Sequence, residues 1–319
     1  MIDEKFSGVT RLGDNLLINH LESNFKSFLE WGFLNIGGFI NVKRSVDNLY
    51  DSSFYKLKPI EDPNYTSGQV WQTHKKDWVW ESGIVFDSNS PINISGIYID
   101  NNFYPTGIVD PEYSYKLDYH SSYLVFDSPI DSSSVVTMDY SYRWVQVYNY
   151  IDASWWQELQ FDSDRDKTHF DNTTGDFVLS SNQRVQLPAI VIETVSRGRS
   201  EPYRLGDKSL IVFQDILLHI LAENLADRNT IIDIIRLQQD KVIWLYNIDQ
   251  IISNNISVFN FDGTLNNNRV QYDNILQNTT FQWKKCKIND IIVSEVSISP
   301  NSLSEATIRL TAEIIFDEM

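Results

Sequence analysis

The chain has 319 residues, which allows one large domain or two, and 42% of them are hydrophobic, enough for a substantial core. It carries 43 acidic and 26 basic side chains, a formal net charge of −17 that argues against nucleic-acid binding through a basic surface. Two explanations of this charge remain open: solubility, and a surface past which DNA slides without being held.

Aromatic residues are frequent, with 9 Trp, 16 Tyr and 17 Phe, and many alternate along the chain as in β-rich proteins. Cys286 is the single cysteine, so no intrachain disulfide can form. Lysines beside it could lower its thiol pKa, but with no base nearby in the sequence we expect a half-buried strand residue. Residues 1–11 have no apolar signal segment and no run is long enough to span a membrane, so we expect synthesis in a reducing cytoplasm.

The N-terminal part predicts one helix and one strand. After a loose arm over residues 1–13, Asp14 begins a helix that runs to about Trp31, with apolar residues at helical spacing. Gly32 is the expected stop, and Phe33–Val42 is the expected first strand.

The composition changes after Arg44 and then favours short strands. Turn signals recur about every 8–12 residues up to residue 150, the spacing typical of a small β-sandwich or barrel. Asp100-Asn101-Asn102 predicts a hairpin turn, and Val135–Tyr148 is the longest strand expected here. The Tyr and Trp residues on one face of that strand could stack on sugars or pack in the core.

The next segment predicts a long connection and then a strand. Residues 151–183 are mostly polar, with Trp155-Trp156 as an anchor. Arg184–Val195 is expected to be a strand, and Ser196–Glu201 a turn.

A long apolar run, Leu210–Ala222, is the centre of the chain. It is too short for a membrane helix and is interrupted by polar residues, so it predicts a mostly buried strand. The apolar spacing over Ile231–Tyr246 predicts a helix, with Asp227 or Asn229 as its N-cap. Ile251–Asn278 is expected to be irregular, and three further strands are predicted: Thr280–Ile288, Ile291–Ile298 and Ala306–Phe316.

These elements favour an α+β fold with an insertion. Residues 1–45 and 180–319 would form a discontinuous α+β domain with a mixed or antiparallel sheet and two main helices. Residues 46–150 would form an inserted all-β, sandwich-like domain, and residues 151–179 the return connection.

The sequence contains no pattern that predicts catalysis or cofactor binding. The five histidines are not at metal-ligand spacing, and no Ser lies in a nucleophile elbow. Asp162–Asp166 is similar to a calcium loop but lacks its sixth-position Gly and twelfth-position Glu. We therefore expect no catalytic, cofactor or metal site.

Four strand-like segments together resemble a β module common in virion proteins of tailed bacteriophages. They lead from Ser95 through the hairpin to Pro105, then continue with Tyr115–Tyr119, Tyr123–Pro129 and Val135–Tyr142. The order of the outer elements, helix, strand, insertion, strand, long strand, helix and strands, resembles tail terminator and tail-completion proteins. The resemblance implies a tail-terminator-like fold for the outer domain.

The resemblance implies a non-enzymatic structural protein of the virion neck. Such proteins form a ring, here expected to be a hexamer, that terminates the tail tube and joins it to the head–tail connector. Neighbouring neck and tail-tube proteins would be partners, and DNA would only pass through. An acidic lumen would leave DNA mobile, and the candidate channel residues are Asp207, Asp215, Glu223, Asp227, Asp233 and Asp240. The alternatives are another virion part (baseplate, fibre or capsid-decorating protein), or a carbohydrate-binding or hydrolytic β protein using Tyr142, Trp144 and Trp155.

Overall fold

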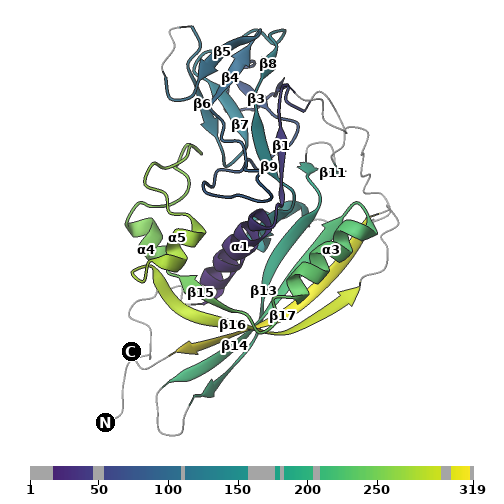
Figure 1. Ribbon diagram of the computed structural model, residues 1–319, viewed down its shortest axis with the longest axis vertical. Helices are drawn as coiled ribbons and strands as arrows, with labels where there is room; N and C mark the ends of the chain where they lie inside the picture. The colour runs from purple at the N-terminus through teal and green to yellow at the C-terminus, as the bar shows by residue number, and fades with distance from the viewer. Residues whose placement is uncertain are drawn as a thin grey trace. The chain divides into compact units, whose positions relative to one another are not determined.

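The computed structural model describes residues 17–45, 54–108, 112–156, 177–179, 183–203, 209–295 and 303–316 (Figure 1). They divide into two compact units. Unit 1 comprises Met1–Glu30, Val145–Ile251 and Tyr272–Met319, and unit 2 comprises Trp31–Trp144 and Ile252–Gln271. Both helices and strands are present, so the α+β class expected from the sequence is confirmed.

Unit 1 contains a six-stranded sheet with the strand order β10-β13-β14-β17-β16-β15. All neighbours are antiparallel except the parallel pair β10 and β13. The strands are β10 (Gln146–Asn149), β13 (Ala189–Pro202), β14 (Leu210–Ala222), β17 (Ser304–Phe316), β16 (Gln282–Glu295) and β15 (Val242–Tyr246). The prediction of a strand over Leu210–Ala222 is confirmed.

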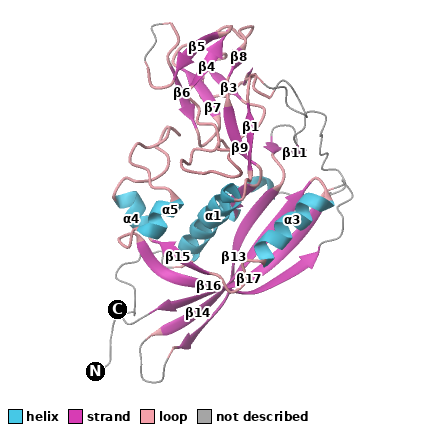
Figure 2. Ribbon diagram, in the orientation of Figure 1, coloured by secondary structure: helices cyan, strands magenta, loops and turns pink. Residues whose placement is uncertain are grey.

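One face of this sheet is apolar because side chains alternate along each strand. On β14, Ile216, Leu218 and Ile220 are fully buried, and they lie opposite Leu310, Ile308 and Ala306 of β17. Helix α3 (Leu225–Arg236) packs against β14 and β17 through its own buried isoleucines (Figure 2). We call this side of the sheet the helical face and the other side the open face, although Trp155 and Trp156 cover the open face beside Ala189, Val191 and Leu221.

The segment predicted as one helix over Ile231–Tyr246 is a helix followed by a strand. Asn224, rather than Asp227 or Asn229, caps α3, because its side-chain oxygen accepts a hydrogen bond from the Asp227 N–H at 2.9 Å. The helix ends at Arg236, and Asp240 takes a left-handed conformation with φ 64° before β15. Val242 and Leu245 fit helical spacing, but pairing with β16 makes this stretch extended.

Other predicted boundaries are also corrected. Helix α1 spans Ile18–Asn35 and passes through Gly32, so the predicted strand Phe33–Val42 is reduced to β1 (Phe39–Val42). Ser196–Glu201 is not a turn, since β13 continues to Pro202 with an irregularity between Thr194 and Gly198. The two predicted strands from Thr280 to Ile298 are the single strand β16, with a register shift between Asn289 and Ile292.

The remaining elements of unit 1 are short. The 3₁₀ helix η1 (Tyr150–Asp152) follows β10, and β11 (Phe177–Leu179) pairs with β12 (Gln183–Val185). The stretch predicted as irregular, Ile251–Asn278, includes the end of α4 (Ile248–Ser253) and the helix α5 (Tyr272–Gln277).

Unit 2 is built from three small sheets. Their strand orders are β1-β9, β2-β3-β7-β6 and β5-β4-β8. The strands are β2 (Lys58–Pro59), β3 (Val70–Gln72), β4 (Gly96–Ile99), β5 (Asn102–Pro105), β6 (Tyr115–Asp118), β7 (Tyr123–Phe126), β8 (Val136–Thr137) and β9 (Tyr140–Arg143). The predicted hairpin at Asp100-Asn101 joins β4 to β5, whereas the predicted strand Val135–Tyr148 is divided among β8, β9 and β10.

The units do not divide at the positions expected from the sequence. The expected boundary after residue 45 falls inside unit 2, because β1 pairs with β9. The expected end of the insertion at residue 150 falls inside unit 1, because β10 pairs with β13. Ile252–Gln271 also belongs to unit 2.

A buried ion cluster fixes β9 in unit 2. The Arg143 guanidinium contacts the carboxylates of Asp77 and Glu81, each at 2.6 Å, and donates to the Trp78 carbonyl at 3.2 Å. The side chains of Arg143 and Glu81 are only 3% and 5% exposed, so each charge depends on the other for its solvation.

We predict that Arg143→Met lowers the free energy of unfolding by about 3–5 kcal/mol, because it leaves the Glu81 carboxylate buried without its partner. Arg143→Met combined with Glu81→Leu should recover part of this loss, since both charges are then absent. Urea denaturation of the wild type, the double variant and both single variants, Arg143→Met and Glu81→Leu, checks both outcomes. A double variant as unstable as the sum of its single changes would contradict the coupling.

Candidate functional site: the open corners of the six-stranded sheet

The edge strands of the unit 1 sheet are much shorter than its inner strands. β10 pairs only with Ala189–Ile192 of β13, and β15 pairs only with residues 282–287 of β16. Within the described ranges, no strand pairs with the outer edge of Gly198–Pro202 or of Asn289–Glu295. We call these stretches the β13 corner and the β16 corner.

The two corners lie diagonally across the sheet. Tracing the residue pairs from strand to strand places Ser200 of the β13 corner at the same level as Cys286 of β16. At that level β15 occupies the opposite edge of the sheet. Val293 of the β16 corner lies level with Ile192, where β10 covers the opposite edge. Each corner is therefore a notch beside the end of a short edge strand.

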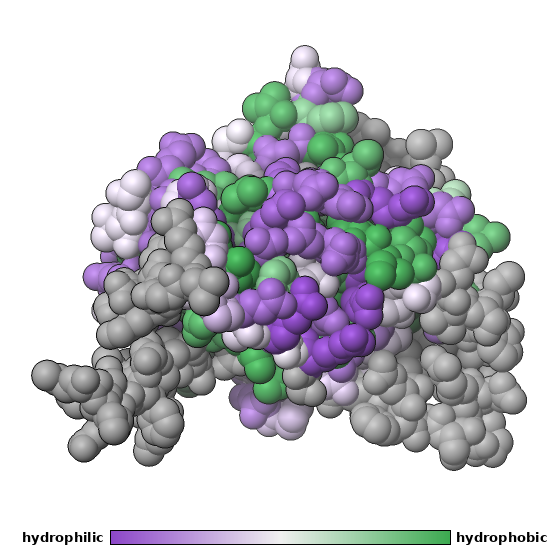
Figure 3. Space-filling view, turned by 90° about the horizontal axis from the view of Figure 1, so that it is seen from below, coloured by the Kyte–Doolittle hydropathy of each residue, from purple (hydrophilic) through white to green (hydrophobic). Residues whose placement is uncertain are grey.

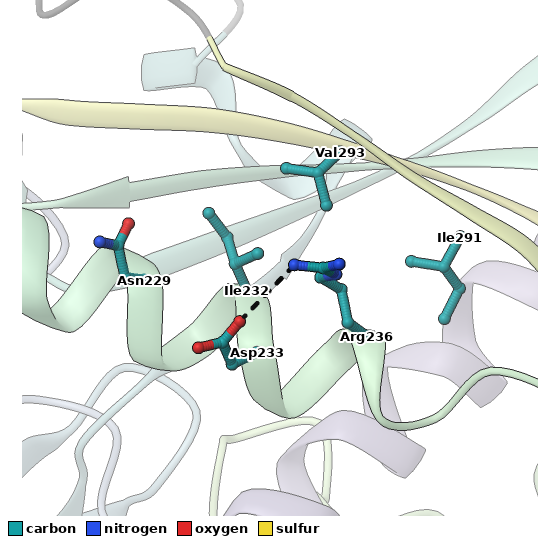
Figure 4. A pocket seen from close by; sticks show the side chains of 6 residues that line it. All are labelled: Asn229, Ile232, Asp233, Arg236, Ile291 and Val293. Atoms are coloured by element: carbon teal, nitrogen blue, oxygen red, sulfur yellow. Dashed lines mark ion pairs between the residues drawn. The ribbon is translucent and has the colours of Figure 1, made fainter.

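A groove runs along the β16 corner on the helical face. It encloses about 510 Å³ between α3 and β16 and is lined by Asn229, Ile232, Asp233, Arg236, Ile291 and Val293 (Figure 4). The apolar side chains of Ile232, Ile291 and Val293 line part of it. Asp233 and Arg236 form an exposed ion pair at 3.9 Å. The groove can accommodate small side chains next to an unpaired strand.

The β13 corner has small residues on the helical face and charged residues on the open face. Gly198, Ser200 and Pro202 pair with β14 residues whose side chains point to the helical face. Arg199 and Glu201 point to the open face, where their charged groups are 3.4 Å apart. On the helical side this corner therefore carries only small residues at Ser200 and Pro202, while the Gln214 side chain lies against Gly198.

Helix α1 caps other edge positions of the sheet with side chains. The Glu22 carboxylate accepts a hydrogen bond from the Thr194 N–H at 3.2 Å. The buried Asn24 amide accepts from the Tyr246 N–H at 2.8 Å and donates to the Tyr246 carbonyl at 3.1 Å, as a neighbouring strand would. Edge groups beside the core are therefore satisfied by α1.

The sequence did not indicate a Glu–His–Thr arrangement on the open face. His219 Nε2 lies 2.8 Å from a Glu193 oxygen, and Nδ1 lies 3.4 Å from the Thr307 hydroxyl. An acid, an imidazole and a hydroxyl in this order occur in nucleophilic catalysis. The His219–Thr307 contact is long, however, and the Trp156 ring lies 4.8 Å from the imidazole. The groove lies on the other face, so we interpret these residues as structural.

The structure does not gather the predicted channel acids on one surface. Asp215 is on the open face, mostly buried, and accepts a hydrogen bond from Thr311 at 2.8 Å. Asp233 is on α3, which covers the helical face. Asp227 is bonded to the α3 cap residue Asn224, and Asp207 lies outside the described residues.

The other two acids lie at element ends. Glu223 is exposed between β14 and α3. Asp240 contacts Lys287 at 2.8 Å, just before β15. In the view of Figure 3, hydrophilic residues make up much of the coloured surface, with separate hydrophobic patches between them.

Most of the residues considered for cysteine chemistry and sugar binding are buried. Cys286 is inside the sheet, where burial raises the pKa of its thiol to about 12, so the flanking lysines do not activate it. Of the proposed sugar-binding residues, Tyr142 and Trp155 are also buried, which favours packing over stacking on a ligand, whereas Trp144 is partly exposed.

The described part of the chain contains no group of three or more His, Cys, Asp or Glu residues placed to hold a metal ion. Among the same residues, no helix has the length and hydropathy to span a membrane. Comparison of the chain with protein-family models, curated proteins and solved structures found no match.

We predict that Asn24→Ala lowers the free energy of unfolding by about 2–4 kcal/mol, because it leaves the Tyr246 N–H and carbonyl without their buried partner. Asn35→Ala is the matched control in the same helix, since Asn35 is exposed and its amide donates to the Trp31 carbonyl one turn earlier. The control should change the free energy by less than about 1 kcal/mol in urea denaturation. Equal losses would contradict the capping role.

The pKa of His219 predicts a pH dependence of stability. Burial lowers this pKa from 6.5, although the Glu193 contact opposes the change. Below about pH 6.5 the unfolded chain therefore binds a proton that the folded chain does not, and stability falls as the pH falls toward the lowered pKa.

His219→Gln should remove this contribution, so the wild type should lose more stability than the variant between pH 7 and pH 5. Glu193→Gln removes the charge that raises the His219 pKa and should increase the loss. Urea denaturation at several pH values measures both slopes. Identical slopes for the wild type and His219→Gln would contradict the assignment.

Proposed function

We propose that the protein is a non-enzymatic structural subunit of the neck of a tailed-phage virion. In this role it is made in the host cytoplasm and assembles into a ring, most simply a hexamer, that terminates the tail tube and joins it to the head–tail connector. The starting point is the resemblance of its β module to virion proteins of tailed phages and of its element order to tail terminator proteins. Because fold alone does not define function, the proposal needs a further observation from the structure.

The observation that carries the proposal is the pair of open corners in unit 1. They lie on opposite edges of one sheet, so one copy can present one edge to each of two neighbours. Head-to-tail contacts of this kind close into rings when the rotation between copies divides a full turn. A subunit with two different, non-overlapping edges is suited to such an assembly.

The charge of the chain supports a role beside moving DNA. Six copies would carry about −100 in formal charge, and such a ring repels a polyanion such as DNA rather than binding it. DNA is then passing cargo rather than a ligand. Neighbouring neck and tail-tube proteins are the partners in this proposal, and no membrane is involved.

A baseplate, fibre or capsid-decorating role is the alternative within the virion, because open sheet edges also suit those assemblies. Carbohydrate binding is less well supported, since two of its three candidate residues, Tyr142 and Trp155, are in the core and only Trp144 is partly exposed. Position in the particle therefore distinguishes the remaining possibilities.

We predict that native mass spectrometry of the purified protein gives a ring of about six chains of 37.1 kDa each. Gold-labelled antibodies should bind tailed-phage particles at the head-proximal end of the tail. Label at the distal end, on fibres or on the capsid would contradict the neck assignment and favour another virion role. Specific glycan binding or turnover by the isolated chain would contradict the structural role.

A further inference from the structure

We propose that the β13 corner of one copy pairs with the β16 corner of the next, so that the sheets of neighbouring subunits form one continuous antiparallel sheet. This inference rests on the ring proposed above and names the surface that holds it together. The partner is a second copy of this chain, and the contact is made by backbone hydrogen bonds between two unpaired strand edges.

The strand directions permit this contact. β13, β14, β17 and β16 alternate in direction, so β16 runs opposite to β13. Successive copies in a ring are related by rotation about the ring axis, which does not reverse the direction of a strand along that axis. The β13 edge of the next copy therefore meets β16 in antiparallel orientation, which continues the alternation of the sheet.

The lengths of the two corners also match. The β13 corner ends at Pro202, and the β16 corner begins just beyond the end of β15, where Asp240 and Lys241 still bond to Ile288. A segment entering this notch can pair over about five residues before it reaches β15. At the other end, the short strand β10 of the entering copy lies beyond Glu295, so it does not overlap β16.

The side chains fit the groove on the helical face. A continuous sheet keeps its faces, so Gly198, Ser200 and Pro202 of the entering strand would point toward α3 of the receiving copy. These small residues would lie over Ile232, Ile291 and Val293 in the 510 Å³ groove. Larger side chains at these positions would meet α3, so the small residues are what allows the approach.

Gly198 has a second constraint inside its own chain. A Cβ there would lie 2.8 Å from the Gln214 side-chain oxygen, and the Gln214 amide donates to the Arg197 carbonyl at 3.3 Å and also to the Val195 carbonyl. These bonds hold the irregularity of β13 between Thr194 and Gly198. The corner beyond it is therefore positioned as an extended edge rather than as a free loop.

The diagonal offset of the corners suits a closed ring. Pairing Ser200 with Val293 displaces successive copies by about six residues along the strands, roughly 20 Å. From one corner to the other each copy contributes four of its six strands, β13, β14, β17 and β16, roughly 19 Å across. The displacement along the strands is thus about equal to the width of one copy across the strands. With these dimensions the copies return to the same height along the ring axis if their strands tilt by about 45° to that axis, a tilt found in closed β-sheets.

Cysteine cross-linking tests the pairing directly. A chain with Ser200→Cys and Val293→Cys should form, under mild oxidation, a covalent ladder that ends at the ring. The native Cys286 does not interfere, because it is buried. Ser200→Cys with Lys284→Cys is the matched control: Lys284 is on the same strand and face as Val293 but beside β15, so no ladder should form.

A second pair of variants tests the groove without a cross-link. Ser200→Trp places a large ring on the side that faces α3 and should weaken assembly at least about tenfold in native mass measurements. Glu201→Trp places the same ring on the open face and should weaken it much less. Circular dichroism of both variants verifies that each chain is folded.

The outcomes separate this inference from the proposed function. The edge pairing is overturned, while the proposed ring is retained, if the native mass is that of a ring but no cross-linked ladder forms. The same conclusion follows if Ser200→Trp assembles as well as the wild type. Dimers formed by Ser200→Cys alone also overturn it, because they indicate a two-fold contact between β13 edges. A single-chain mass at all concentrations, with no ladder, contradicts both the pairing and the ring.

Discussion

The pairing of β14 with β17 along their whole lengths is the constraint on which the rest of unit 1 depends. The register runs from Leu210 opposite Phe316 to Ala222 opposite Ser304, so the two strands are paired without interruption. β13 and β16 extend alongside them to similar lengths, but the chain supplies only four and five residues for the edge strands β10 and β15. Long inner strands with short edges necessarily leave backbone donors and acceptors open, and these must bond to water or to another strand.

Those open edges differ from the edge positions near the core. Where burial would leave a group unsatisfied, α1 supplies a side chain, as Asn24 does for Tyr246 and Glu22 for Thr194. The Glu22 carboxyl is half-buried there, and this burial raises its pKa. The corners lie farther out, where water can satisfy the edge of an isolated copy and a neighbour can replace that water. This arrangement allows one sheet to be stable alone and still be able to assemble.

The sequence predicts the apolar strands well because burial and alternation leave a local pattern. Leu210–Ala222 was predicted with its observed bounds, and the turn at Asp100-Asn101 was predicted from its residue types. The prediction was wrong where strand pairing overrides a local helical preference, as at Val242 and Leu245. It was also wrong around Gly198, where the residue types of a strand irregularity are the same as those of a turn. The corners themselves leave no local signal, since an unpaired edge is defined by strands that stop elsewhere in the chain.

The position of the acidic residues limits what the net charge can do. Asp215 is bonded within the open face, Asp227 within the cap of α3, and Asp240 to Lys287. These groups have local partners and lie on different elements of one copy. The excess of acids must then act as a distributed field, which weakens over about 8 Å at physiological ionic strength. In the ring proposed above, such a field would keep DNA from adhering at any one place, because repulsion from many screened charges needs no defined contact surface.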